Sequence, residues 1–256
     1  MIFDVSPDAY YRFIGRYSEP LAAQFADLAG VRPGAQAGQK LLDVGCGPGA
    51  LTAELARRAG PEAISAAEPS ASFVAAARDR VPTADIRQAR AEELPFATDA
   101  FDAALAQLVV HFMADPVLGL REMGRVTRPG GVVAACVWDH AGDRGPVALF
   151  WTAARQIDPA APDESELAGA RAGDLARLFT AAGLSDVRSI ELTVRGAYAT
   201  FEAWWEPYTL GVGPAGAYVA SLSPEHLAAL RDQCRRLLPA APGEIAATAW
   251  AVTAHP

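Results

Sequence analysis

One short segment, residues 41–49 (Leu-Leu-Asp-Val-Gly-Cys-Gly-Pro-Gly), constrains the fold of this chain more than any other. It begins as an apolar run typical of a buried strand. Gly45, Gly47 and Gly49 follow, where they permit positive φ and leave no side chain between the backbone and a ligand. A helical pattern then begins near Thr52. A strand, a glycine turn and a helix in this order place backbone N–H groups at the crevice where α/β sheets bind ligands.

The rest of the chain alternates between strand and helix patterns, as a doubly wound parallel sheet requires. Further strands are expected at residues 63–68, 85–89, 101–110, 132–138, 187–195 and 245–253. Helices are expected at residues 70–81, 115–126, 147–157, 175–182 and 224–238, and the segment Arg128-Pro129-Gly130-Gly131 is expected to end the second of these. Because 256 residues can bury a single large core, we predict one α/β domain.

The glycine turn alone does not identify its ligand, because Gly45 to Ala50 also satisfies the dinucleotide pattern G-x-G-x-x-G/A. Asp43 favours a different cofactor, since a carboxylate would repel a pyrophosphate but attract an ammonium and a sulfonium. Glu68, 23 residues after Gly45, can accept hydrogen bonds from both hydroxyls of a ribose. NAD enzymes use an acidic residue at a similar distance, so Glu68 leaves a nicotinamide-dependent oxidoreductase open.

A third motif is the segment Arg90-Ala-Glu-Glu-Leu-Pro-Phe96, followed by Asp99-Ala-Phe-Asp102. Together with residues 41–49, it resembles class I S-adenosylmethionine-dependent methyltransferases, of the group that includes the ubiquinone/menaquinone biosynthesis C-methyltransferases (methyltransferase type 11 domain). The resemblance covers residues 38–138. It implies a Rossmann-like, seven-stranded, mostly parallel sheet with helices on both faces and an antiparallel last strand. This chain has Ala89 and Arg90 where the group has Gly and Asp, and an arginine cannot accept the adenine amino proton.

The same resemblance implies S-adenosyl-L-methionine as the cofactor and indicates which residues bind it. In this chain they are Asp43, Gly45, Cys46, Gly47, Gly49, Glu68, Pro69, Ala91, Glu92 and Gln107, with Arg16 as a partner for the cofactor carboxylate. For Cys46 a simpler reason also exists, because the turn requires a small side chain there. Arg16 belongs to the segment Tyr10 to Ser18, which is similar to a helix that covers the cofactor in some members of the group. An amphipathic helix packed on the sheet explains this segment equally well.

We expect three parts within the single domain. An N-terminal helical cap (1–37) precedes the cofactor-binding core (38–138), and the C-terminal part (139–256) contains a substrate-cap insertion at about residues 196–244. The insertion is rich in aromatic residues, namely Phe201, Trp204, Trp205, Tyr208 and Tyr218. Such residues can build an apolar acceptor pocket that excludes water, although Trp204 and Trp205 can equally serve to pack the insertion on the domain.

Composition excludes several other classes of protein. The net charge of −8 and the absence of a basic cluster argue against a nucleic-acid partner. The chain has no apolar run that could span a bilayer and no leader-like start, so we expect a cytoplasmic protein with no membrane contact, a monomer or homodimer. Its three cysteines are far apart and without neighbouring histidines, a pattern that indicates neither a disulfide nor a metal site.

These features predict methyl transfer to a partly apolar small-molecule acceptor by direct displacement, which yields S-adenosylhomocysteine. If the acceptor is a hydroxyl, a general base can assist, and His111 is the first candidate and His140 the second. Both histidines are also explained by a purely structural role. A nicotinamide-dependent oxidoreductase and a non-catalytic S-adenosylmethionine-binding protein stay open as alternatives.

Overall fold

The computed structural model describes residues 5–34, 38–162, 164–238 and 243–256, so the expected N-terminal cap and insertion are each seen only in part. Seven strands form one sheet in the order β3-β2-β1-β4-β5-β7-β6. Their bounds are β1 Leu41–Val44, β2 Ile64–Glu68, β3 Asp85–Gln88, β4 Phe101–Gln107, β5 Thr127–Trp138, β6 Ser185–Tyr198 and β7 Gly243–His255. Strands β1 to β5 pair in parallel, and β7 runs antiparallel to both of its neighbours. The predicted fold class is thereby confirmed.

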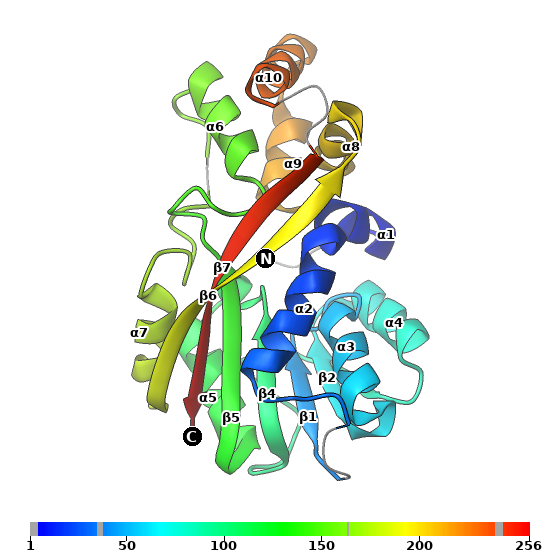
Figure 1. Ribbon diagram of the computed structural model, residues 1–256, viewed down its shortest axis with the longest axis vertical. Helices are drawn as coiled ribbons and strands as arrows, with labels where there is room; N and C mark the ends of the chain where they lie inside the picture. The colour runs from blue at the N-terminus through cyan, green and yellow to red at the C-terminus, as the bar shows by residue number, and fades with distance from the viewer. Residues whose placement is uncertain (1–4, 35–37, 163, 239–242) are drawn as a thin grey trace.

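Helices cover both faces of this sheet (Figure 1). On one face lie α2 (Arg16–Leu28), α3 (Ala50–Ala59) and α4 (Ala71–Arg80). Their apolar residues pack on Leu41 of β1 and on Ile64 and Ala66 of β2. On the other lie α5 (Pro116–Val126) and α7 (Asp174–Ala181), which pack on Leu42 and Val44. The central strand β1 is buried on both faces, which explains its continuous apolar sequence.

Two differences from the predicted element boundaries stand out, one at each end of the sheet. Strand β4 ends at Gln107 rather than at residue 110, because Leu108 takes a positive φ of 61° and Val110–Phe112 form a 3-10 turn. Helix α5 ends at Val126, and the Arg128 to Gly131 segment expected to end it instead lies within strand β5. Gly131 has no room for a side chain, since a Cβ there would overlap Thr127 and the Asp102 carbonyl.

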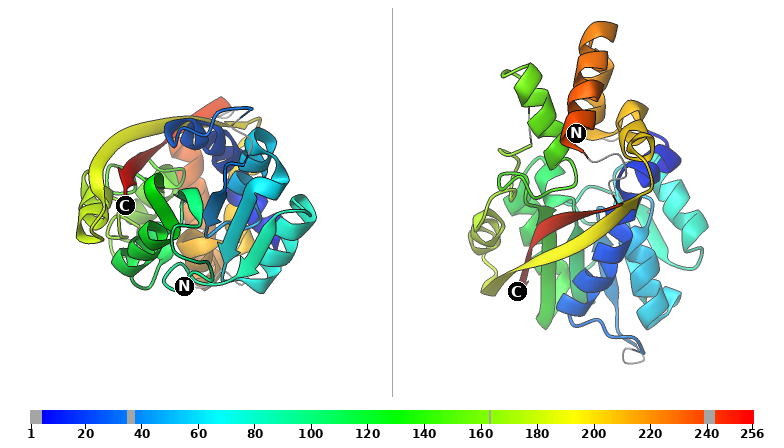
Figure 2. Two further views of the ribbon diagram at one scale, coloured as in Figure 1. Left: turned by 90° about the horizontal axis from the view of Figure 1, so that it is seen from below. Right: turned by 45° about the horizontal axis from the view of Figure 1, so that its top comes forward.

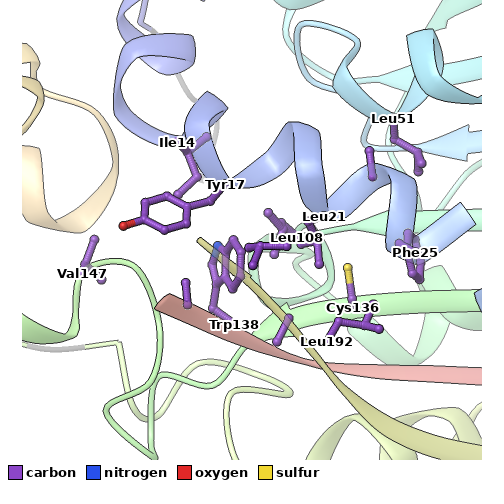
Figure 3. Packing of buried hydrophobic residues seen from close by; sticks show 14 of the residues in the cluster. Ile14, Tyr17, Leu21, Phe25, Leu51, Leu108, Cys136, Trp138, Val147 and Leu192 are labelled. Carbon is purple, nitrogen blue, oxygen red and sulfur yellow. The ribbon is translucent and has the colours of Figure 1, made fainter. Parts of the chain in front are cut away.

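The N-terminal segment crosses the sheet and does pack on it. Helix α1 (Pro7–Tyr10), a π-helical turn (Tyr11–Gly15) and α2 follow one another without a break. Figure 3 shows Tyr17, Leu21 and Phe25 projecting from this helix toward the strands, and all three side chains are buried. The packing interpretation of this segment is therefore correct for α2. Tyr10, at the end of α1, lies elsewhere, at the site described below.

The C-terminal insertion forms a small helical group at the carboxyl end of β6. It consists of α8 (Phe201–Trp205), a 3-10 turn (Glu206–Leu210), α9 (Gly213–Ser221) and α10 (Pro224–Leu237). Helix α6 (Ala148–Ile157), which follows β5, packs against α10, and Figures 1 and 2 show these helices together beyond the end of the sheet. Within the described residues, no helix has the length and apolar character to cross a membrane.

Candidate active site

A cleft with several polar groups in its walls lies at the carboxyl ends of β1, β2 and β4, where a doubly wound sheet is expected to bind its ligand. Its walls come from the glycine turn, the end of β2, the loop after β3, the end of β4 with the turn that follows, and α1. The lining residues are Tyr10, Gly45, Gly47, Glu68, Pro69, Phe73, Arg90, Ala91, Glu92, Gln107, Leu108, Val109, Phe112 and Met113. The structure thus brings together seven of the residues predicted to bind the cofactor.

The glycine turn forms the floor of this cleft. Gly45 and Gly47 both have positive φ, at 70° and 52°. A Cβ on Gly45 would overlap the side chain of Val109. A Cβ on Gly47 would point into open space, with no neighbouring atom within 4 Å. The Gly45 N–H donates to the Ala67 carbonyl at 2.8 Å, which ties the turn to the end of β2. The backbone therefore approaches the cleft without intervening side chains, as the sequence predicted.

Glu68 joins the two loops that frame the cleft. One carboxylate oxygen accepts from the Gly47 N–H at 3.0 Å, and the other accepts from the Ser70 N–H at 2.9 Å. Burial raises the pKa of Glu68, and these two backbone hydrogen bonds partly oppose the rise. Each oxygen has a further lone pair available, so the carboxylate can accept hydrogen bonds from a diol in the cleft.

Asp43 lies deeper than predicted, buried at 1% exposure and outside the lining of the cleft. Its Oδ2 accepts from the Thr52 hydroxyl at 2.6 Å, while its Oδ1 is buried without a hydrogen-bond partner. Burial raises the pKa of this carboxyl to about 7, the Thr52 hydrogen bond lowers it, and Glu68 raises it further. An unsatisfied buried oxygen at this depth is a suitable acceptor for a cationic group.

The loop after β3 forms the opposite wall. Glu92 does not point its charge freely into the cleft, because Oε1 accepts from the Ala114 and Asp115 N–H groups at 2.7 and 3.3 Å. Burial alone would raise the pKa of Glu92, but these hydrogen bonds and nearby Arg90 outweigh burial and lower it. Arg90 lies 3.5 Å from Glu92 Oε2 and lines the cleft instead of pointing only to solvent. The backbone of Ala91 is left as the loop's contribution.

Gln107 closes the inner end of the cleft. Its Nε2 donates to the Ser18 carbonyl of α2 at 3.0 Å, which fixes the amide plane. Its Oε1 is buried and has no hydrogen-bond partner. Two buried acceptor oxygens, on Asp43 and Gln107, thus lack donors beside the cleft, and a ligand with an ammonium group would supply them.

Three predicted cofactor residues lie elsewhere. The Cys46 side chain packs with Ala66 and Val74 in a small apolar cluster, so only its backbone belongs to the turn. Gly49, at φ 91°, caps α3 and allows close packing against α4. Arg16 donates to the Ala197 carbonyl at 2.7 Å and lies 5.1 Å over the Tyr198 ring, so strand β6 occupies its guanidinium. None of these three residues is among those that line the cleft.

A second, more apolar cavity of about 470 Å³ adjoins the first. The two share Tyr10, Leu108 and Phe112 as a common wall. The remaining lining residues of this second cavity, called the acceptor cavity below, are Phe13, Ile14, His111, Trp138, His140, Pro146, Val147, Glu164, Val212, Gly213 and Pro214. Both histidines proposed from the sequence lie here, with their ring centroids 6.0 Å apart.

The aromatic residues of the insertion do not line the acceptor cavity as predicted. Trp204, Trp205 and Tyr208 are buried at 2%, 6% and 4% exposure in the main apolar core. Tyr208 stacks on Phe150 of α6 with ring centroids 4.6 Å apart. The alternative, that these side chains pack the insertion on the domain, is correct. The insertion contributes to the cavity only through Val212, Gly213 and Pro214, which carried no sequence signal.

Glu164 is the ionisable residue of the acceptor cavity that the sequence did not reveal. It follows α6 in an irregular segment without apolar periodicity, so no pattern distinguished it from neighbouring surface carboxylates. The structure buries it at 7% exposure. Across the described parts of the chain, no group of three or more His, Cys, Asp or Glu side chains is arranged to hold a metal ion.

Known proteins with similar sequences show the family of this chain. The model of a family described as a methyltransferase domain matches residues 42–135. A demethylmenaquinone methyltransferase of Mycobacterium sp. (strain JLS) is 35% identical over 170 residues, which cover 61% of this chain and 72% of that protein. Methyltransferase GfsG of Streptomyces halstedii is 41% identical over 104 residues, which cover 38% of this chain and 37% of that protein. The chain belongs to the S-adenosylmethionine-dependent methyltransferases of this family.

Solved structures show the same fold at lower sequence identity. A Bacillus halodurans protein described as a methyltransferase aligns with a TM-score of 0.57 and 16% identity. The alignment covers 91% of this chain and 97% of that protein. Geranyl diphosphate C-methyltransferase from Streptomyces coelicolor, solved with Mg²⁺, geranyl diphosphate and S-adenosylhomocysteine, aligns at 0.55 and 16%, over 94% and 80%. The cofactor of the family is S-adenosylmethionine. The unpartnered Oε1 of Gln107 and the carboxylate of Glu68 are acceptors of the kind that its ammonium and ribose groups require.

Proposed function

We propose that this protein transfers the sulfonium methyl group of S-adenosylmethionine to a small, partly apolar acceptor by direct displacement, with S-adenosylhomocysteine as the second product. The observation that carries this proposal is the shared wall of Tyr10, Leu108 and Phe112 between the cleft and the acceptor cavity. Two adjoining cavities, the first with the more polar lining, suit a polar cofactor and an apolar acceptor held against each other.

Each wall of the cleft has a role in holding the cofactor. Glu68 would accept hydrogen bonds from the ribose hydroxyls, and the backbone of Gly45 and Gly47 would lie against the cofactor. The Ala91 backbone would lie against adenine, and the unsatisfied Oε1 of Gln107 would accept from the methionyl ammonium; both residues line the cleft, which supports these roles. S-adenosylmethionine bound here supplies an activated methyl group, so the protein itself needs mainly to position the acceptor and exclude water.

The setting of the enzyme is also a proposal. We place it in the cytoplasm, because Cys46, Cys136 and Cys234 are all free and buried, as is usual in a reducing compartment. We expect a monomer or homodimer, in which residues 1–37, 38–138 and 139–256 act as one domain around one site. Sedimentation of the purified protein would measure the oligomeric state, and limited proteolysis would report any independent unit.

Calorimetric titration with S-adenosylmethionine and S-adenosylhomocysteine tests the cofactor, with NAD and NADP as competitors for the same cleft. We expect micromolar binding of both adenosyl ligands and its loss in Glu68→Ala. The matched control is Glu166→Gln, which changes a carboxylate far more exposed than Glu68. Tight binding of NAD or NADP, or unchanged adenosyl binding in Glu68→Ala, would contradict the proposal. Formation of S-adenosylhomocysteine with a panel of acceptors separates an enzyme from a protein that only binds the cofactor.

A further inference from the structure

The acceptor cavity contains few charges, and their signs restrict what it can bind. Its walls are mostly apolar side chains, and its ionisable side chains include His111, His140 and Glu164. Among the described residues that line it, none is a lysine or an arginine. A phosphate or carboxylate on the acceptor would therefore lie near the carboxylate of Glu164, with no lysine or arginine among the described lining residues to offset the repulsion, which is a costly arrangement. The cavity fits an acceptor without negative charge.

His140 and Glu164 form a buried pair in this cavity. Nδ1 of His140 lies 4.0 Å from Oε2 of Glu164, and the two side chains are only 6% and 8% exposed. Glu164 Oε2 also accepts from Nε1 of Trp151 at 2.8 Å, which holds the carboxylate in place from α6. At 4.0 Å the carboxylate is too far for a hydrogen bond, but it is close enough to oppose a positive charge on the imidazole, so a proton taken up by the ring would have a nearby counterion.

His111 has a different environment. It is buried and its Nδ1 has no hydrogen-bond partner. Burial and the neighbouring His140 lower its pKa well below the usual value. A neutral, buried imidazole with an unsatisfied nitrogen is suited to a hydrogen bond with the acceptor, whereas burial and the neighbouring His140 disfavour a proton on it.

We infer that the acceptor is an uncharged, largely apolar molecule with a hydroxyl group, and that His140, positioned by Glu164, takes the proton of that hydroxyl during methyl transfer. This inference rests on the proposed function and specifies its acceptor and base. It moves the role of base from His111, the first choice from the sequence, to His140, and makes Glu164 a positioning residue.

The step balances without any further reactant. The hydroxyl oxygen forms a bond to the methyl carbon as the carbon–sulfur bond breaks, and the electrons of that bond return to sulfur, which becomes a neutral thioether. The hydroxyl proton passes to His140, whose imidazolium charge is opposed by Glu164. Within the described parts of the chain, the groups that face His140 include Glu164 from the segment after α6 and His111 from the turn after β4. Asp139, its chain neighbour, is already paired with Arg144 at 2.5 Å.

Three acceptors of one shape test the chemistry with the full-length protein and S-adenosylmethionine: 4-propylphenol, 4-propylaniline and 4-propylphenyl phosphate. We expect S-adenosylhomocysteine to form with the phenol at least tenfold faster than with the other two. In parallel, calorimetry on the protein saturated with S-adenosylhomocysteine measures binding of the same compounds and of propylbenzene. The phenol should bind more tightly than both the phosphate ester and propylbenzene.

Variants then test the base. In Glu164→Gln we expect kcat to fall about 10- to 100-fold with KM changed less than threefold, because general bases contribute roughly 10²- to 10⁴-fold. The pH at which kcat reaches half its plateau should move to lower pH, because loss of the carboxylate makes His140 a weaker base. His140→Gln should abolish the pH dependence, and Glu166→Gln, on the same segment, should leave the whole profile unchanged.

The outcomes separate the two proposals. If S-adenosylmethionine does not bind, the proposed function fails. If it binds but the aniline is the better acceptor, or the phosphate ester or propylbenzene binds as tightly as the phenol, the inference is overturned and the proposed function stands. A kcat profile in Glu164→Gln that matches the wild type also overturns the inference, whatever the plateau rate.

Discussion

The buried carboxyl of Asp43 should make the stability of the cofactor-free protein fall as pH rises. Burial raises its pKa from 3.8 to about 7, partly opposed by the hydrogen bond from Thr52. The folded protein therefore holds this proton more tightly than the unfolded chain does. Its contribution to stability is complete below about pH 3.8 and is lost as pH rises through about 7.

The magnitude follows from the pKa shift. A rise from 3.8 to about 7 corresponds to roughly 4 kcal/mol, at about 1.36 kcal/mol per pKa unit. About half of this, roughly 2 kcal/mol, is lost between about pH 5.5 and about pH 8.5. Asp43→Asn removes the ionisation and retains an acceptor oxygen for the Thr52 hydroxyl. The variant should therefore gain about 2 kcal/mol relative to the wild type across that interval.

Urea unfolding at the two pH values, followed by circular dichroism, measures this difference between the two proteins. Glu166→Gln, which removes one carboxylate at an exposed site, is the control and should track the wild type. Parallel pH dependences for the wild type and Asp43→Asn would refute the reasoning, because they would mean that Asp43 is not buried as an unpaired carboxylate. The variant should also bind S-adenosylmethionine more weakly, since the cationic cofactor loses a negative partner.

Three further substitutions test other parts of the site. Gly45→Ala should lower the free energy of unfolding by about 1–3 kcal/mol and weaken cofactor binding more than tenfold, because its φ is 70° and its Cβ would overlap Val109; full binding in calorimetry would contradict this. Tyr10→Ala should reduce the affinity for S-adenosylmethionine about tenfold, because the variant loses the contact between the Tyr10 and Phe73 rings in the cleft. A change of less than twofold would show that α1 does not cover the cofactor. Trp204→Ala should destabilise the fold by about 3–5 kcal/mol in urea titrations, while the KM for the acceptor, measured on the folded fraction, stays within threefold. A larger change in KM would indicate that the aromatic residues of the insertion contribute to acceptor binding.

Local chemistry made much of the cofactor cleft predictable. The turn from Gly45 to Gly49 needs positive φ, and the acidic residue Glu68 must end the neighbouring parallel strand, so both are visible as short-range patterns in the sequence. The alternation of strands and helices also predicted a parallel sheet with helices on both faces, although not the order of its strands. Gln107 was placed through resemblance to known methyltransferases, and it does line the cleft.

The sequence by itself determined the sheet, the glycine turn and the class of cofactor, because each depends on residues close together in the chain. Only the tertiary structure decided which side chains face the ligands. Arg16 and Trp204 carry the right chemistry for a site. The guanidinium of Arg16 instead binds strand β6, far away in sequence, and Trp204 is buried in the core among the aromatic residues of its own insertion. Glu164 shows the converse, since only the packing of α6 and the strand end beside His140 turns an unremarkable carboxylate into a buried partner of that histidine.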